Sequence, residues 1–360
     1  MPPVLGSQPA QPPAVFSSLS LEALGRILEI SATDYKGNLD ISRVAALCLV
    51  CKAFRKAALL THRLWTDVST DGSVPLHEAM AWLKRSDSLP KTLRFTQEDL
   101  PCDKHDNWSE VNQGDDGTSN SSQCVLIAAQ ALQCAESGVP LDSLCITPSS
   151  PACVRDLLLS SPSSHFKTSA CWSSLRSLNL NMEGCKVWPD PETDLATSMF
   201  NHLPPSLSSL GISLPYKSGL GDSFDDTTQP INIPPSIPTR LTSFRIQSDW
   251  EGPQAATLLQ HCMSLERLTI EYMMDSVDGD NGLPAQIFLP KLKTLKVHGI
   301  SGETADTILH FLRAPTLRHI DIGVDREYKM DDYPEHPAYL FFNPSVYSPQ
   351  NQRSPRHWNP

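Results

Sequence analysis

The stretches LERLTI (residues 265–270) and LKTLKV (residues 292–297) decide the fold. Both place apolar residues first, fourth and sixth, with polar or charged residues between them. Because successive side chains of a β-strand point to opposite faces, the fourth and sixth side chains share one face and their neighbours point to the other. Each stretch therefore predicts a strand with one apolar face that must be covered.

The same apolar-x-x-apolar-x-apolar pattern occurs seven times, and the last four copies begin 24 to 27 residues apart. The earlier copies begin 32 to 34 residues apart and so carry longer insertions. A weaker copy, LPKTLRF, has only Leu93 and Phe95. This periodicity predicts a stack of similar units. The seven copies are Leu141/Leu144/Ile146, Leu175/Leu178/Leu180, Leu207/Leu210/Ile212, Leu241/Phe244/Ile246, Leu265/Leu268/Ile270, Leu292/Leu295/Val297 and Leu317/Ile320/Ile322.

Stretches with helical character lie between several of these strands. A strand that is followed by a helix and then by a parallel strand stacks into a right-handed solenoid, in which each unit covers the apolar face of the next. We therefore expect an α/β fold in which residues 71–324 form parallel strands with helical returns. The expected returns are SQCVLIAAQALQCAES (122–137), PACVRDLLLS (151–160), DLATSMFNHL (194–203), GPQAATLLQHC (252–262) and ETADTILHFLR (303–313).

Residues 16–70 predict a separate helical module. Ser20 and Asp40 are suited to cap two helices, because their side-chain oxygens can accept hydrogen bonds from a first helical turn. Projected as one continuous helix from Ile41 to Ala58, the apolar residues sweep about half of the circumference, wider than the stripe of roughly 100° that one packing partner needs. We therefore expect a second polypeptide to cover the excess.

Cys48 and Cys51 form a Cys-x-x-Cys inside this helical run. A redox motif would stand at an electropositive helix start beside a βαβ unit, and a zinc site would need further ligands, for which His62 or the distant Cys102 and His105 are the candidates. Since free cysteine is among the most buried residue types, we interpret both as packing residues and expect no metal site and no cofactor.

The segment from residue 41 to residue 66 contains five basic residues and no acidic one. One interpretation is a solvated face whose aliphatic stems cover apolar surface. The other is electrostatic steering towards an acidic protein partner. The five residues are Arg43, Lys52, Arg55, Lys56 and Arg63.

The composition limits the function classes. The formal net charge of −11 opposes a general role on nucleic acid or on an anionic membrane, so we expect neither as a partner. No secretory signal and no apolar run of 18 residues occurs, and the ten cysteines lack the spacing of a secreted disulfide scaffold. These features predict a soluble protein of the cytoplasm or the nucleus.

Three blocks of the helical module resemble the F-box, a compact three-helix family. They are the apolar helix from Leu19 to Leu28, the Val-Cys-Lys-x-aromatic block at residues 50–54, and a late Leu-Trp; Ser20 stands where that family usually has proline. The resemblance implies docking onto a Skp-family adaptor, and through it onto a cullin in a ubiquitin ligase. The adaptor-binding residues that it implies are Leu19, Leu21, Leu24, Ile27, Leu28, Val50, Cys51, Phe54, Leu64 and Trp65.

The repeats are similar to irregular leucine-rich repeats, and WLKRSDSLPKTLRF (residues 82–95) resembles a segment of F-box repeat proteins in mushroom-forming fungi. In such a solenoid the residues that alternate with the leucines line the concave face. The C-terminal strands offer mixed charges there, which make them the candidate site for a target protein, although a polar strand face is also what solvation alone predicts. The candidates are Arg245, Gln247, Arg267, Glu271, Lys296, His298, His319 and Asp321.

Three further segments are expected to lie outside these modules: a disordered N-terminus at residues 1–15, a flexible insertion at about 98–122, and a Pro-rich tail at 325–360 that caps the repeats or hangs free. The sequence contains no Gly-x-Ser-x-Gly, Walker or His-Glu-x-x-His motif, so we expect no enzyme. The predicted function is a non-catalytic substrate receptor of a Skp-cullin-F-box ubiquitin ligase. A repeat scaffold without ligase assembly is the alternative.

Overall fold

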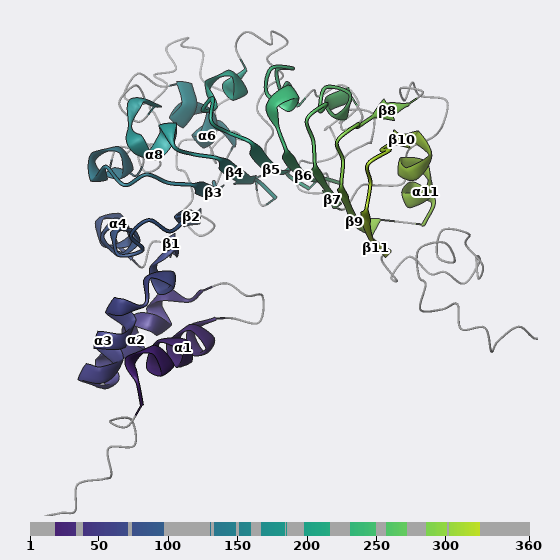
Figure 1. Cartoon of the computed structure of the whole chain (residues 1–360). Coiled ribbons are helices and arrows are strands. Elements are labelled where there is room, and N and C mark those ends of the chain that lie inside the picture. Colours follow the sequence, from purple (N-terminus) through teal and green to yellow (C-terminus); the bar gives the residue numbers. More distant parts are fainter. Residues whose placement is uncertain are drawn as a thin grey trace, which may run out of the picture. The chain divides into compact units, whose positions relative to one another are not determined.

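A computed structural model of the 360-residue chain defines the fold (Figure 1). The expected segments at residues 1–15, 98–122 and 325–360 lie outside the residues that the structure describes. The described residues are 19–33, 39–70, 74–96, 130, 133–148, 151–159, 167–183, 185, 198–216, 231–249, 257–271, 286–300 and 302–324.

Nine strands form one sheet in the order β1-β2-β3-β4-β5-β6-β7-β9-β11. The pair β1–β2 and every pair from β4 to β11 are parallel. The predicted α/β class with parallel strands is therefore confirmed. The strands are β1 (Asp67–Thr70), β2 (Thr92–Thr96), β3 (Ser143–Thr147), β4 (Ser177–Asn181), β5 (Ser209–Ser213), β6 (Ser243–Gln247), β7 (Arg267–Glu271), β9 (Thr294–Ile300) and β11 (His319–Val324).

All seven copies of the repeat pattern are strands, and the register aligns their apolar positions. Leu178 pairs with Leu210, Leu210 with Phe244, and the row continues to the last strand. From β4 to β9 each row buries its members, because the apolar side chains of one unit pack on those of the next, whereas Ile320 and Ile322 of β11 are partly exposed. The exposed fraction is 2% or less for Leu178, Leu210, Phe244, Leu268 and Leu295.

Four of the five expected returns contain helix. Two are α6 (Pro151–Leu159) and α11 (Gly302–Phe311), and the described parts of the returns at 122–137 and 252–262 are helical at residues 133–137 and 257–259. The described part of DLATSMFNHL contains only the 3-10 turn η5 (Met199–His202), whose N-cap is Ser198. The other returns include α8 (Ala170–Ser173), the 3-10 turn η6 (Pro238–Arg240), and a small parallel sheet of β8 (Ile287–Phe288) and β10 (Leu312–Arg313) that the sequence analysis missed.

The N-terminal helices are α1 (Leu21–Ala32), α2 (Ile41–Val50) and α3 (Lys52–Leu60), followed by the 3-10 turn η2 (His62–Trp65). Ser20 caps α1 and Asp40 caps α2, as the sequence predicts. The prediction of one continuous helix from Ile41 is wrong. The chain is extended at Cys51, with φ −158° and ψ 163°, and the Cys51 sulfur accepts a hydrogen bond from Phe54 N at 3.4 Å as the N-cap of α3.

The chain divides into two compact units, which are described separately below. The first contains the N-terminal helices, β1, the helix α4 (Leu76–Lys84) and β2, together with residues 129–145 and 165–175. The second contains the described residues within 146–164 and 176–324, and so includes the strands from β4 to β11. Strand β1 was not expected, whereas β2 is the weak copy at Leu93 and Phe95.

Candidate functional site

Exposed apolar side chains concentrate on the N-terminal helices. Among the described residues, ten large hydrophobic side chains are exposed, and seven of them fall between residues 19 and 60. A stretch that small carries far more than its share of the exposed apolar surface, which marks it as a candidate interaction site. The seven are Leu19, Ile27, Ile30, Leu49, Val50, Leu59 and Leu60.

Helix α1 separates its apolar residues into two faces. Leu24 and Leu28 are 1% and 0% exposed and form the face packed inward. Ile27 and Ile30 are three residues apart, so they neighbour each other on a different face, where they are 39% and 64% exposed. The helix is therefore apolar on more than the side that its own chain covers.

Helix α2 covers little of its own apolar surface. Of its ten residues only Ile41 and Val44 are buried, whereas Leu49 is 86% and Val50 62% exposed at its C-terminal end. Leu49 was not among the predicted contacts, although it stands beside Val50.

Helix α3 repeats this arrangement at its own C-terminal end. Phe54, Ala57 and Ala58 are buried and pack on the neighbouring helices, whereas Leu59 and Leu60 are 43% and 58% exposed. The sequence analysis missed this pair and Ile30. The available signal was that each is a leucine or isoleucine that lies just outside the spacing of the inward-facing residues.

Five of the ten predicted adaptor-binding side chains are instead buried within the chain. Leu24, Leu28 and Phe54 fill the space between the helices. Leu64 is 0% and Trp65 3% exposed. The Trp65 indole N–H donates to the carbonyl of Ala58 at 2.9 Å. These five side chains hold the module together and offer no surface to a partner.

The other half of the predicted contacts remain accessible. Leu19, Ile27 and Val50 are exposed, and Leu21 and Cys51 are partly exposed. The exposed three, with the four exposed leucine and isoleucine side chains that were missed, define the apolar surface of the helices. The name "helical apolar surface" is used below for these seven residues: Leu19, Ile27, Ile30, Leu49, Val50, Leu59 and Leu60.

The five basic residues that follow Asp40 are all exposed. None of them forms a salt bridge with another residue in the part of the chain that the structure describes. Their charge is therefore available to a partner. Arg43 lies in α2, Arg63 lies in η2, and α3 carries Lys52, Arg55 and Lys56, so a polypeptide that covers the helical apolar surface approaches positively charged elements.

Neither cysteine of the Cys-x-x-Cys pair is arranged for chemistry. Burial raises the pKa of the Cys48 thiol above its ordinary value, although the positive charges of Arg55 and Arg85 act to lower it. A raised pKa disfavours the reactive thiolate. The Cys51 sulfur caps α3. Within the described ranges, no group of three or more His, Cys, Asp or Glu side chains is placed to hold a metal ion, and no helix is both long and apolar enough to cross a membrane.

The second candidate surface is the polar face of the C-terminal strands, formed by the residues that alternate with the buried ones. The register places Arg245 beside Thr269, Thr269 beside Lys296, and Lys296 beside Asp321. A second row runs from Gln247 through Glu271 to His298, and a third joins Arg267 to His319 through Thr294. All eight predicted target-binding residues therefore share one face.

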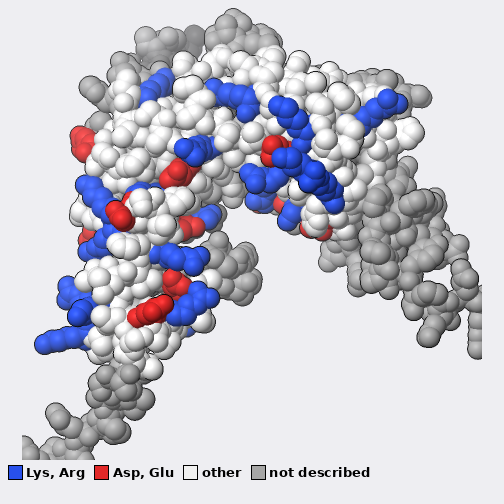
Figure 2. Space-filling view, viewed as in Figure 1, with Lys and Arg blue, Asp and Glu red and all other residues white. Residues whose placement is uncertain are grey.

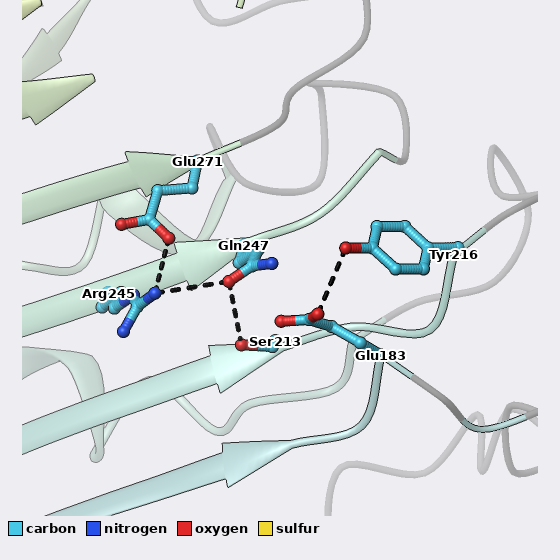
Figure 3. Close-up of polar contacts among 6 residues, drawn as sticks. All are labelled: Glu183, Ser213, Tyr216, Arg245, Gln247 and Glu271. Atoms are coloured by element: carbon cyan, nitrogen blue, oxygen red, sulfur yellow. Dashed lines mark hydrogen bonds and ion pairs between the residues drawn. The ribbon is translucent and has the colours of Figure 1, made fainter. Parts of the chain in front are cut away.

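Most of the charges on this face are paired with one another, and Figure 3 shows the group around Arg245. Arg245 donates to Glu271 at 2.6 Å and to the side-chain oxygen of Gln247 at 3.4 Å, which also accepts from Ser213 at 3.3 Å. Gln247 is only 5% exposed, so it acts as a buried anchor that orients the guanidinium. Such pairing between strands cannot be read from the sequence before the register is known.

The last two strands carry a second charge group. Lys296 Nζ lies 3.8 Å from Asp321 Oδ2, and His298 Nε2 lies 3.3 Å from the same oxygen. Gly323 makes room for His298, because a Cβ at this position would lie 2.8 Å from His298 Nδ1. The side chains of Glu183 and Tyr216, after β4 and β5, form a separate contact of 3.1 Å (Figure 3).

No protein-family model matches the chain, and no curated protein matches its sequence significantly.

Proposed function

We propose that the chain is a non-catalytic substrate receptor whose N-terminal F-box-like helices dock a Skp-family adaptor, and through it a cullin, while leucine-rich repeats hold a target protein. The observation that carries this proposal is the helical apolar surface. Seven large apolar side chains are exposed on about forty residues, although the strands from β4 to β9 bury their apolar side chains almost completely. In water such a surface favours a second polypeptide as its cover.

The size of the effect matches what association requires. A fully buried aliphatic side chain contributes roughly 1.5–3 kcal/mol relative to an exposed one. Burial of the exposed parts of the helical apolar surface therefore contributes an amount of the same order as the cost of association, which is estimated at about 4–15 kcal/mol. The five basic residues of α2, α3 and η2 favour an acidic partner.

The test is co-purification of the tagged full chain with a Skp-family adaptor expressed in the same cells. We expect Leu49→Glu with Val50→Glu to reduce the recovered adaptor more than tenfold, because two charges would be buried in the interface. Met263→Glu is the matched control, since Met263 is also apolar and 45% exposed but lies in the other unit.

Circular dichroism of both variants shows whether the fold is retained. Adaptor recovery that is unchanged in the helical variant, at wild-type helix content, contradicts the proposal. Equal loss in the Met263→Glu control does so as well, because the loss would then not depend on the helical apolar surface.

The alternative is a repeat scaffold in which the helices cap the first strands. It is favoured by one observation: η2 leads directly into β1, whose Val68 is 0% exposed, and the helices belong to the same compact unit as β1 and β2. In that case the variants at Leu49 and Val50 lower the melting temperature of the chain, and no adaptor is recovered with the wild type.

A further inference from the structure

A cluster of basic residues lies where β7, β9 and β11 begin. Backbone hydrogen bonds set Glu266, Lys293 and Arg318 side by side in successive strands: Lys293 N donates to Glu266 O at 2.8 Å, and Arg318 N to Lys293 O at 2.9 Å. Arg267 and Lys291 stand beside them in the chain, and both are exposed. The name "basic ridge" is used below for Arg267, Lys291, Lys293 and Arg318.

The ridge has more positive charge than its own acidic residue can neutralise. Glu266 lies 2.9 Å from Lys293 Nζ. The hydrogen bond from Lys293 and the positive charges of Lys293, Arg267 and Lys291 hold the pKa of Glu266 below its ordinary value. Three cations thus act on one carboxylate, and Arg318 adds a fourth positive charge beside Lys293.

The neighbouring carboxylates do not correct this imbalance. Glu271 is held by Arg245 at 2.6 Å, and Asp321 is shared by Lys296 and His298. Among the described residues, Arg267, Lys291 and Arg318 form no salt bridge. Figure 2 shows blue side chains gathered over the C-terminal strands with some red among them, in a chain whose net charge is −11.

We infer that the basic ridge binds an acidic, extended segment of a protein, rich in Asp and Glu. Neighbouring strands are about 4.8 Å apart and an extended chain rises about 3.3 Å per residue, so a short segment that crosses the three strands brings carboxylates to all four cations. Arg267 belongs to the face that the proposed function assigns to target binding, so the inference names the chemistry of that target and rests on the proposed function.

A protein segment fits the surroundings better than a nucleic acid does. The net charge of −11 repels a long polyanion along its whole length. A short acidic peptide meets less of this repulsion, because it needs contact only at the strand beginnings.

The test measures binding of a fluorescent 12-residue peptide of alternating Glu and Asp to the purified full chain, by anisotropy at low salt. We expect Arg267→Glu with Arg318→Glu to weaken the affinity at least tenfold, and Arg267→Gln with Arg318→Gln to weaken it less. Arg176→Glu is the matched control, since Arg176 is exposed and occupies the same repeat position before β4, where its carbonyl accepts from Ser208 and Ser209. It is expected to leave the affinity within twofold.

Equal affinity of wild type and the double Glu variant overturns the inference, as does an equal loss in the Arg176→Glu control. Binding of a peptide of alternating Gln and Asn with the same affinity also overturns it, because charge would then not matter. The inference is also overturned if a thymidine oligonucleotide binds more tightly than the acidic peptide and the same substitutions weaken its binding. Adaptor recovery with the double Glu variant is measured in parallel, so that failure of the ridge and failure of adaptor docking are distinguished.

Discussion

The N-terminal helices and the repeat strands are both rich in aliphatic residues, but they cover them differently. Leu268 and Leu295, in neighbouring strands, pair in register and are 1% and 0% exposed. Leu49 and Val50, at the end of α2, are 86% and 62% exposed. A repeat unit is covered by the next copy of itself, whereas three short helices have too few neighbours to cover every apolar face. The comparison teaches that leucine content alone does not locate an interaction surface. Such a surface lies where apolar side chains have no neighbouring element to cover them.

The largest expected effect is in the repeats. Leu268→Ala removes a buried side chain and leaves a cavity between strands, so we expect it to lower the free energy of unfolding by about 2–5 kcal/mol. Val50→Ala changes an exposed side chain, and we expect a change within about 0.5 kcal/mol. Urea unfolding followed by tryptophan fluorescence measures both. Similar losses at the two positions would remove the distinction between the regions.

A second prediction concerns the packing of α1 on α3. Gly25 is buried, and a Cβ at this position would collide with Thr61 Oγ1, which donates to the carbonyl of Ala57 at 2.8 Å. We expect Gly25→Ala to destabilise the helices by about 1–3 kcal/mol, as overpacking does. Adding Thr61→Ala removes the colliding atom, and the double variant should recover this loss, because alanine is the better helix former.

Thermal unfolding of the two single variants and the double variant gives the coupling between the positions. An additive result would mean that Gly25 and Thr61 do not meet, and that the close approach of α1 and α3 is wrong.

A third prediction concerns the break between α2 and α3. The Cys51 sulfur is a weak acceptor for Phe54 N, at 3.4 Å. Serine provides a better cap, so we expect Cys51→Ser to keep or raise the stability of the helices, and Cys51→Ala to lower it by up to about 1 kcal/mol. Helix content and melting temperature compare the two variants. Higher stability of Cys51→Ala than of Cys51→Ser would show that position 51 does not cap α3.

The smallest effect is expected from Glu266 at the basic ridge. Because the pKa of Glu266 is lowered in the folded chain, its favourable contribution is present at pH values above its unfolded pKa and is lost as the pH falls through its folded pKa. NMR titration of the Glu266 carboxyl should show a midpoint below the ordinary glutamate value. Lys293→Ala should move the midpoint upward, and an unchanged midpoint would mean that Lys293 does not set it.

The strands were predictable and the helix boundary was not, for physical reasons. Seven copies of one pattern in a constant phase reinforce one another, so the strands and their buried faces follow from the sequence. The break at Cys51 carries no glycine or proline, and cysteine is not among the preferred capping residues, so nothing local announced it. The assignment of Phe54 to a partner failed because that break rotates α3 and turns Phe54 inward.

The pairing of charges was also beyond the sequence. The analysis identified Arg245 and Glu271 as members of one polar face, but their contact depends on the register of β6 with β7. The exposed ends of α2 and α3 were missed for a similar reason. Exposure is the absence of a neighbour, and only the three-dimensional arrangement shows which neighbours are absent.

The central claim is that another polypeptide covers the helical apolar surface. A photo-cross-linking amino acid in place of Val50, in the full chain co-expressed with a Skp-family adaptor, tests it most directly. The account predicts a covalent adduct with the adaptor from position 50 and none from the same amino acid in place of Met263, which is exposed in the other unit. Absence of an adduct from position 50, or equal adducts from both positions, would contradict it.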